Sequence, residues 1–146
     1  MSPDEGGVKR ANRVADKMGL GLAIIHKERS QANIIDRMEL IGNVSGKIVV
    51  MIDDMIDTAG TICNAAVTAM EKGAKSVTAI ATHPVLSGPS IERLQSSPIS
   101  KVVVCDTIDL EAKRLDKLEV ISVADVFGES IKRIVDGTSL SSMFDF

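Results

Sequence analysis

Two adjacent carboxylates, Asp53 and Asp54, directly follow an apolar run of β-forming residues at 47–52. Carboxylates repel phosphate, but they accept hydrogen bonds from hydroxyl groups and bind cations that bridge to phosphates. After these acids the chain passes through a short turn of small residues into a segment that is expected to be helical. A strand that ends in acids and is followed at once by a helix indicates a ligand site.

The turn between the acids and the helix has the residues that a phosphate group needs, and it reads Asp57, Thr58, Ala59, Gly60 and Thr61. Small residues let the backbone approach a ligand closely, and Gly60 can adopt a positive φ. The helix N-terminus adds unpaired amides and a positive dipole end, and the threonines add hydroxyl donors. A phosphate cradle beside acceptors for vicinal hydroxyls predicts a ribose 5-phosphate site. The alternative is an ordinary strand–turn–helix with a capping residue and surface acids.

The elements that must position this site alternate along the chain. Hydrophobic periodicity and turn residues predict helices at 8–18, 61–72, 90–94 and 124–135. Short apolar runs predict strands at 22–25, 38–41, 47–52, 76–82, 101–105 and 119–123, with a polar loop at 26–37. This alternation predicts an α/β fold with a parallel central sheet flanked by helices. In such sheets ligands bind where strand C-termini meet helix N-termini.

The composition excludes several classes of function. The chain has 146 residues, 45% of them apolar, which suffices for one domain with an aliphatic core. It has three Phe, no Trp or Tyr and a net charge of −3, so no nucleic-acid or membrane surface is expected. Cys63 and Cys105 lie far apart and predict free thiols in a cytoplasmic protein.

Five segments together resemble the ribose-phosphate pyrophosphokinase (PRPP synthetase) family, which has the type I phosphoribosyltransferase fold. They are SPDEGGVKRA, IIHKERSQANIIDRMELIGNVSGK, VVMIDDMIDTAGT, ATHPVLSGPSIERL and SLSSMF. The resemblance implies that residues 1–146 form one phosphoribosyltransferase-like domain. This domain would be the C-terminal half of the family enzyme, without the N-terminal half that binds ATP. A strand is expected before the opening turn.

The resemblance also implies an activity. ATP and ribose 5-phosphate would give 5-phosphoribosyl 1-diphosphate (PRPP) and AMP. Lys27 and Arg29 match the catalytic loop pair of the family, and Arg29 could also hold phosphate oxygens of the substrate. Asp53 would accept hydrogen bonds from the ribose hydroxyls with Asp54 close by. The 5-phosphate would bind at Asp57, Thr58, Ala59, Gly60 and Thr61.

Metal and regulatory roles follow only from the same resemblance. Asp4 matches an aspartate associated with Mg²⁺, although an Asp after Pro is also a common turn and capping residue. Ser139, Ser141 and Phe144 match a regulatory region that binds phosphate or ADP between neighbouring subunits, and the alternative is a frayed tail. The implied full-length protein is a homo-oligomer. His26 and His83 are expected to be structural.

Three functions are considered for a domain of this fold. The first is a pyrophosphokinase half that keeps the ribose 5-phosphate site but is inactive alone. The second is a non-catalytic regulatory or sensing module, which the presence of both loop cations disfavours. A base phosphoribosyltransferase would need a segment that recognises a nucleobase, and no candidate is found. If the N-terminal half is missing, the apolar side of helix 124–135 is expected to be exposed or to find a substitute partner.

Overall fold

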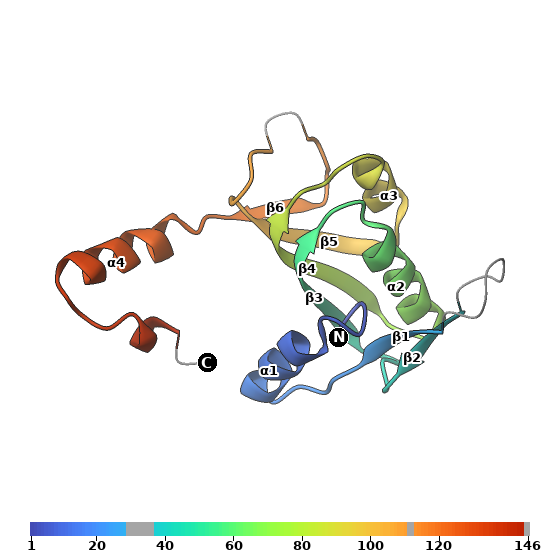
Figure 1. Cartoon of the computed structure of the whole chain (residues 1–146). Helices are drawn as coiled ribbons and strands as arrows, with labels where there is room; N and C mark the ends of the chain where they lie inside the picture. Colours follow the sequence, from blue (N-terminus) through green and yellow to red (C-terminus); the bar gives the residue numbers. More distant parts are fainter. Residues whose placement is uncertain (29–36, 111–112, 145–146) are drawn as a thin grey trace.

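The computed structural model describes residues 1–28, 37–110 and 113–144, which form an α/β fold (Figure 1). The strands are β1 (Ile24–Glu28), β2 (Arg37–Ile41), β3 (Ile48–Ile56), β4 (Ser76–Pro84), β5 (Ile99–Cys105) and β6 (Leu118–Ile121). The helices are α1 (Val8–Met18), α2 (Gly60–Glu71), α3 (Ser90–Ser96) and α4 (Ala124–Val135), with a 3₁₀ turn at Ser141–Met143.

A four-stranded parallel sheet forms the centre of the molecule, in the order β3-β4-β5-β6. Strands β1 and β2 form a separate antiparallel pair. The predicted parallel sheet flanked by helices is therefore confirmed. Because all four central strands run the same way, their C-terminal ends lie along one edge, where Asp53 stands beside Ala81 of β4.

The first two residues join the two sheets. The Ser2 amide donates to the Ala23 carbonyl at 2.9 Å, and the Ile25 amide donates to the Ser2 carbonyl at 3.1 Å. On the other side, the Met1 amino group donates to the Val50 carbonyl at 2.7 Å. This backbone segment thereby fixes β1, which carries Lys27, relative to β3, which carries the acids.

The core is aliphatic, as the composition predicts. Helix α2 packs against β3 and β4 through Ala65, Ala66 and Ala69, whose side chains are fully buried. Alanine has no side-chain rotamers to lose and lets a helix approach a sheet closely. The buried side chains of Met51 and Leu94 fill the space between the sheet and helices α2 and α3.

The predicted helices at 8–18 and 124–135 are confirmed at the same residues. Several other predicted boundaries differ from the structure, and two of the differences involve residues of the candidate site. Strand β3 continues through Asp53 and Asp54 to Ile56, and β1 runs through His26 to Glu28 where a loop was expected. In both cases pairing with a neighbouring strand extends the element through polar residues, because ladder hydrogen bonds use only the backbone.

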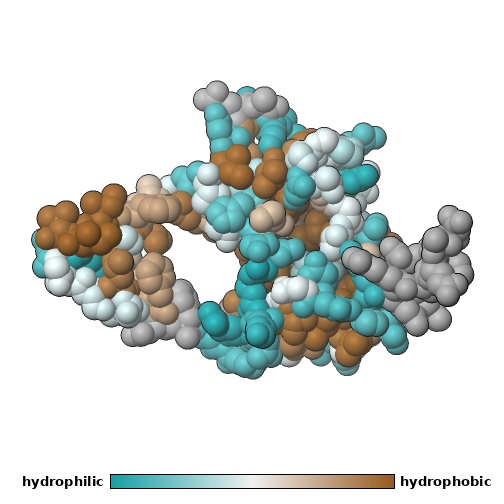
Figure 2. Space-filling model, in the orientation of Figure 1, coloured by the Kyte–Doolittle hydropathy of each residue, from teal (hydrophilic) through white to brown (hydrophobic). Residues whose placement is uncertain are grey.

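Helix α4 stands away from the sheet and is drawn in orange and red in Figure 1. None of its described residues is buried, and Figure 2 shows its apolar side chains gathered at one end of the molecule. The exposed members are Val126, Phe127, Ile131, Ile134 and Val135. The expected exposure of this apolar side is confirmed. Among the described residues, no helix is both long and apolar enough to cross a membrane.

Candidate functional site

The two adjacent carboxylates lie at the C-terminal end of β3 and are held by Arg10 of α1. The guanidinium donates from Nη1 to Asp53 Oδ1 at 2.9 Å and from Nη2 to Asp54 Oδ2 at 2.7 Å. The side chain of Asp53 is 19% exposed and that of Asp54 53% exposed. One arginine therefore positions both acids, with Asp53 the more enclosed of the two.

The two carboxylates have different electrostatic environments. Burial raises the pKa of Asp53, and the negative charges of Asp4 and Asp54 add to this effect. Slight burial would raise the pKa of Asp54 as well, but Arg10 and hydrogen bonds to its charged form lower it. Asp53 is therefore the carboxylate of the pair that protonates first on acidification.

The loop after β3 is braced by the chain that follows β4. Ser87 donates from its hydroxyl to Asp57 Oδ1, and its amide donates to the Asp57 carbonyl at 3.1 Å. The Leu86 amide donates to the Ile56 carbonyl at 2.9 Å, and Arg93 Nη1 donates to the Thr58 carbonyl at 3.0 Å. The segments that follow the neighbouring parallel strands β3 and β4 therefore hold each other in place.

The left-handed residue in this loop is Ala59 and not the expected Gly60. Ala59 has φ 62° and ψ 3°, while Gly60 is the first residue of α2. Among the described residues, no side chain caps the N-terminus of α2. The first amides of this helix have no partner within the helix, and they form the positive end of its dipole.

Lys27 comes from β1 to the same helix N-terminus. Its Nζ donates to Thr61 Oγ1 at 3.2 Å, across 34 residues of sequence. The structure therefore places Lys27 at the 57–61 loop, which follows the strand that carries the acid pair. Arg29, the other predicted loop cation, lies outside the described residues.

The other predicted residues fall in two places. Asp4 accepts a hydrogen bond from the Gly7 amide at 3.1 Å, just before α1, and is close enough to Asp53 to influence its pKa. Ser139, Ser141 and Phe144 lie beyond α4, where Arg133 Nη1 donates to the Ser139 carbonyl at 2.9 Å. The structure groups Asp4 with the acids and leaves the tail residues with α4.

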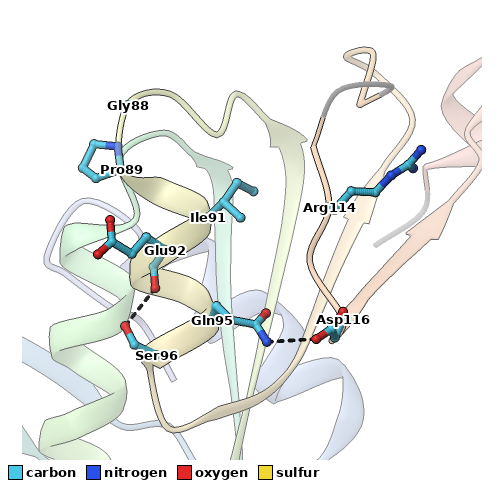
Figure 3. Close-up of a pocket in the computed structure, with 8 residues that line it drawn as sticks. All are labelled: Gly88, Pro89, Ile91, Glu92, Gln95, Ser96, Arg114 and Asp116. Carbon is cyan, nitrogen blue, oxygen red and sulfur yellow. Dashed lines mark hydrogen bonds between the residues drawn. The ribbon is translucent and has the colours of Figure 1, made fainter.

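A hollow lies elsewhere on the described surface. It has a volume of ≈750 Å³ and lies between α3 and the segment that leads to β6 (Figure 3). Its walls include Pro89, Glu92, Gln95 and Arg114, and Gln95 donates to Asp116 Oδ2 at 3.1 Å. None of the residues predicted for the site lines this hollow in the described structure.

Sequence reasoning missed Arg10, Ser87 and Arg93. Arg10 lies on α1, three residues after the opening turn. A basic residue at the start of a predicted helix is only a weak sequence signal for a partner of the two acids. Ser87 and Arg93 act on the 57–61 loop from a segment about 30 residues later. Only the adjacency of β3 and β4 brings them to the loop.

The parallel sheet flanked by helices defines an α/β domain of the phosphoribosyltransferase type. The family model for the phosphoribosyl synthetase-associated domain matches residues 30–145. The chain therefore belongs to the ribose-phosphate pyrophosphokinase family, through its phosphoribosyl synthetase-associated domain.

Individual relatives agree with this assignment. The chain is 50% identical over 145 residues to the ribose-phosphate pyrophosphokinase of Clostridium acetobutylicum, with 99% of this chain and 46% of the relative covered. It is 49% identical over 144 residues to that of Aquifex aeolicus, with the same coverage. The crystal structure of phosphoribosylpyrophosphate synthetase from Mycobacterium smegmatis superposes with a TM-score of 0.85 at 40% identity, covering 93% of this chain and 44% of that one. The chain spans about half the length of the relatives it matches.

The unequal environments of the two acids lead to a prediction for titration of their carboxyl groups. We expect Asp53 to titrate above its ordinary pKa of 3.8 and Asp54 below it. The folded chain then holds the Asp53 proton more tightly than the unfolded chain. Asp53 therefore disfavours folding at neutral pH, and this cost disappears as the pH falls through its folded pKa.

Carboxyl ¹³C NMR of the two side chains measures this difference directly. Arg10→Ala should move the Asp54 midpoint upward, because it removes the cation that lowers this pKa. Arg13→Ala, on the same helix, is the matched control and should leave both midpoints in place. An Asp53 midpoint below that of Asp54 in the unaltered chain would contradict the prediction.

Proposed function

We propose that this chain is the C-terminal, ribose 5-phosphate-binding half of a ribose-phosphate pyrophosphokinase. The observation that carries the proposal is the contact of Lys27 Nζ with Thr61 Oγ1 at the uncapped N-terminus of α2. A cation and free helix amides there suit a phosphate monoester, and the acid pair on the preceding strand suits the hydroxyls of its sugar.

The proposed reaction transfers a diphosphoryl group. The anomeric hydroxyl of ribose 5-phosphate forms a bond to the β-phosphorus of ATP, and the bond from that phosphorus to the α-phosphate oxygen breaks. The products are 5-phosphoribosyl 1-diphosphate, AMP and the proton released from the hydroxyl. Such a transfer depends on in-line positioning of the reactants and on neutralisation of phosphate charge.

The chain would supply the positioning of the sugar and part of the positive charge. Asp53, with Asp54 close by, would accept hydrogen bonds from the ribose hydroxyls, and residues 57–61 would hold the 5-phosphate. Lys27 would neutralise charge on the transferring group. Arg29, outside the described residues, is proposed to assist it with a planar guanidinium that grips phosphate oxygens in pairs.

A Mg²⁺ ion fits this site only as a partner shared with substrate. Among the described residues, no group of three His, Cys, Asp or Glu side chains could enclose a metal ion. Asp4 is a single half-buried carboxylate near Asp53, and Mg²⁺ commonly uses one or two carboxylates with water and substrate phosphates. Asp4 would hold the ion, and the ion would supply charge neutralisation on the ATP phosphates.

The remaining partners belong to the proposed full-length enzyme. ATP would bind mainly to an N-terminal half, and a homo-oligomer would place Ser139, Ser141 and Phe144 at a site for phosphate or ADP. A cytoplasmic location is part of the same proposal. The alternative function, a regulatory or sensing module, is disfavoured because the sequence keeps both Lys27 and Arg29, which match the catalytic loop pair of the family.

We expect the chain to bind ribose 5-phosphate at least tenfold more tightly than ribose, because the amides and Lys27 act on the phosphate. Isothermal titration calorimetry with the two compounds measures this difference.

We also expect little or no AMP release from ATP and ribose 5-phosphate by this chain alone. Equal affinities for ribose 5-phosphate and ribose would contradict the proposed ribose 5-phosphate site. Full turnover would contradict the proposal that this chain is one half of the enzyme.

A further inference from the structure

Helix α3, which follows the bracing loop after β4, carries a cation with no role in the reaction described above. Arg93 lies on α3, and its Nη1 donates a hydrogen bond of 3.0 Å to the carbonyl of Thr58, 35 residues earlier. The residue after Thr58 is Ala59, the left-handed residue at the start of α2. The guanidinium therefore holds the carbonyl that immediately precedes the left-handed residue.

The held carbonyl belongs to the peptide group that enters Ala59. A trans peptide group is planar, with its carbonyl and its N–H on opposite sides. The described residues contain no cis peptide bond. When Arg93 holds the Thr58 carbonyl toward α3, the Ala59 N–H must therefore point to the opposite side of the loop. Arg93 consequently determines the direction of an amide in the segment proposed to hold the phosphate.

Ala59 needs this support because its backbone conformation is unfavourable. Its φ of 62° lies in the left-handed region, which costs energy for any residue with a Cβ atom. A left-handed residue can turn successive amides toward one anion, and strained residues of this kind persist only where neighbouring contacts hold them. Glycine would adopt the same φ without this cost.

We propose that Arg93 is a positioning residue that holds the Thr58–Ala59 peptide group in the orientation needed to bind a phosphate monoester. This inference rests on the proposed function, because it assumes that residues 57–61 hold the 5-phosphate. Arg93 acts through the backbone of the loop and makes no contact with the ligand. The Ala59 amide is then preorganised before ribose 5-phosphate arrives, so its orientation costs nothing on binding.

The test is a double-mutant cycle between residues 93 and 59, with ribose 5-phosphate as the probe in calorimetry. Arg93→Met should weaken affinity about tenfold, because Ala59 must then be driven into the left-handed region on binding. The Ala59→Gly variant supplies the second background of the cycle, and relative to that variant Arg93→Met should cost only about twofold. The matched control Arg13→Met, an exposed arginine on α1, should have no effect.

Two results would overturn the proposal. If Arg93→Met costs the same factor in the unaltered chain and in the Ala59→Gly variant, the guanidinium acts on the ligand directly or through its charge. If Arg93→Met costs nothing in the unaltered chain, the loop does not need it. Arg93→Gln, which keeps a hydrogen-bond donor, is a second variant in case Arg93→Met lowers the melting temperature, and it should retain more affinity than Arg93→Met.

A structural measurement separates this proposal from the proposed function. If the unaltered chain does not bind ribose 5-phosphate, the proposed function fails. The Cα and Cβ chemical shifts of Ala59 then still decide whether Arg93 orients the loop. They should leave left-handed values in Arg93→Met and keep them in Arg13→Met. Unchanged Ala59 shifts in Arg93→Met would refute the role of Arg93.

Discussion

Asp53→Asn is expected to weaken the binding of ribose 5-phosphate by about 100-fold, since each hydrogen bond to a charged acceptor is worth about 1.5–3 kcal/mol. Asp53 is the more enclosed acid, so its carboxylate is less screened by water than that of Asp54. The amide side chain also presents a donor group where the ribose hydroxyls need acceptors. Calorimetry with ribose 5-phosphate measures the loss.

The fold should survive this substitution. Arg10 would lose one of its two ion pairs, but it is 37% exposed and keeps Asp54, and pairs at this exposure contribute little to stability. The matched control is Asp116→Asn, which removes a carboxylate at the hollow beside α3 and should leave the affinity unchanged. An Asp53→Asn affinity within threefold of the unaltered chain, with an unchanged melting temperature, would exclude the acid pair from the binding site.

Met51→Ala should lower the free energy of unfolding by about 2–5 kcal/mol, because it leaves a cavity in the core. Met51 is fully buried in β3, in register with Ala79 of β4, which is also fully buried. Chemical denaturation followed by circular dichroism measures the difference.

The same strand provides the matched control. Met55 lies four residues along β3 and is 48% exposed, so Met55→Ala should change the free energy of unfolding by no more than about 0.5 kcal/mol. Equal losses from the two substitutions would show that the interior of the sheet is not packed as described.

Local signals in the sequence were sufficient for the kind and order of the elements that carry the candidate site, although not for all of their boundaries. The alternation of apolar runs and helical periods predicted the parallel sheet, and α1 and α4 begin and end at the predicted residues. The adjacent acids, the small-residue turn and the following helix are contiguous in the chain, so the predicted phosphate loop needed no long-range information. The resemblance to the pyrophosphokinases rested on the same short segments.

Features that depend on strand pairing were predicted less well. Strand β3 extends through Asp53 and Asp54 because β4 provides backbone partners beyond the apolar run. Strand β1 likewise includes Lys27, which pairs with Met38 of β2. Polar residues give no apolar signal, so a strand that continues through them can be recognised only from its neighbour.

The sequence by itself determined the class of fold, the family and the loop that could bind a phosphate, because each depends on residues that are neighbours in the chain. The tertiary structure decided how that loop is held. It placed Arg10 on both acids, Lys27 on Thr61 and Arg93 on the Thr58 carbonyl, and it put the left-handed conformation at Ala59. These contacts join residues 34 to 44 positions apart, and only the packing of α1, β1 and α3 around β3 brings them within hydrogen-bonding distance.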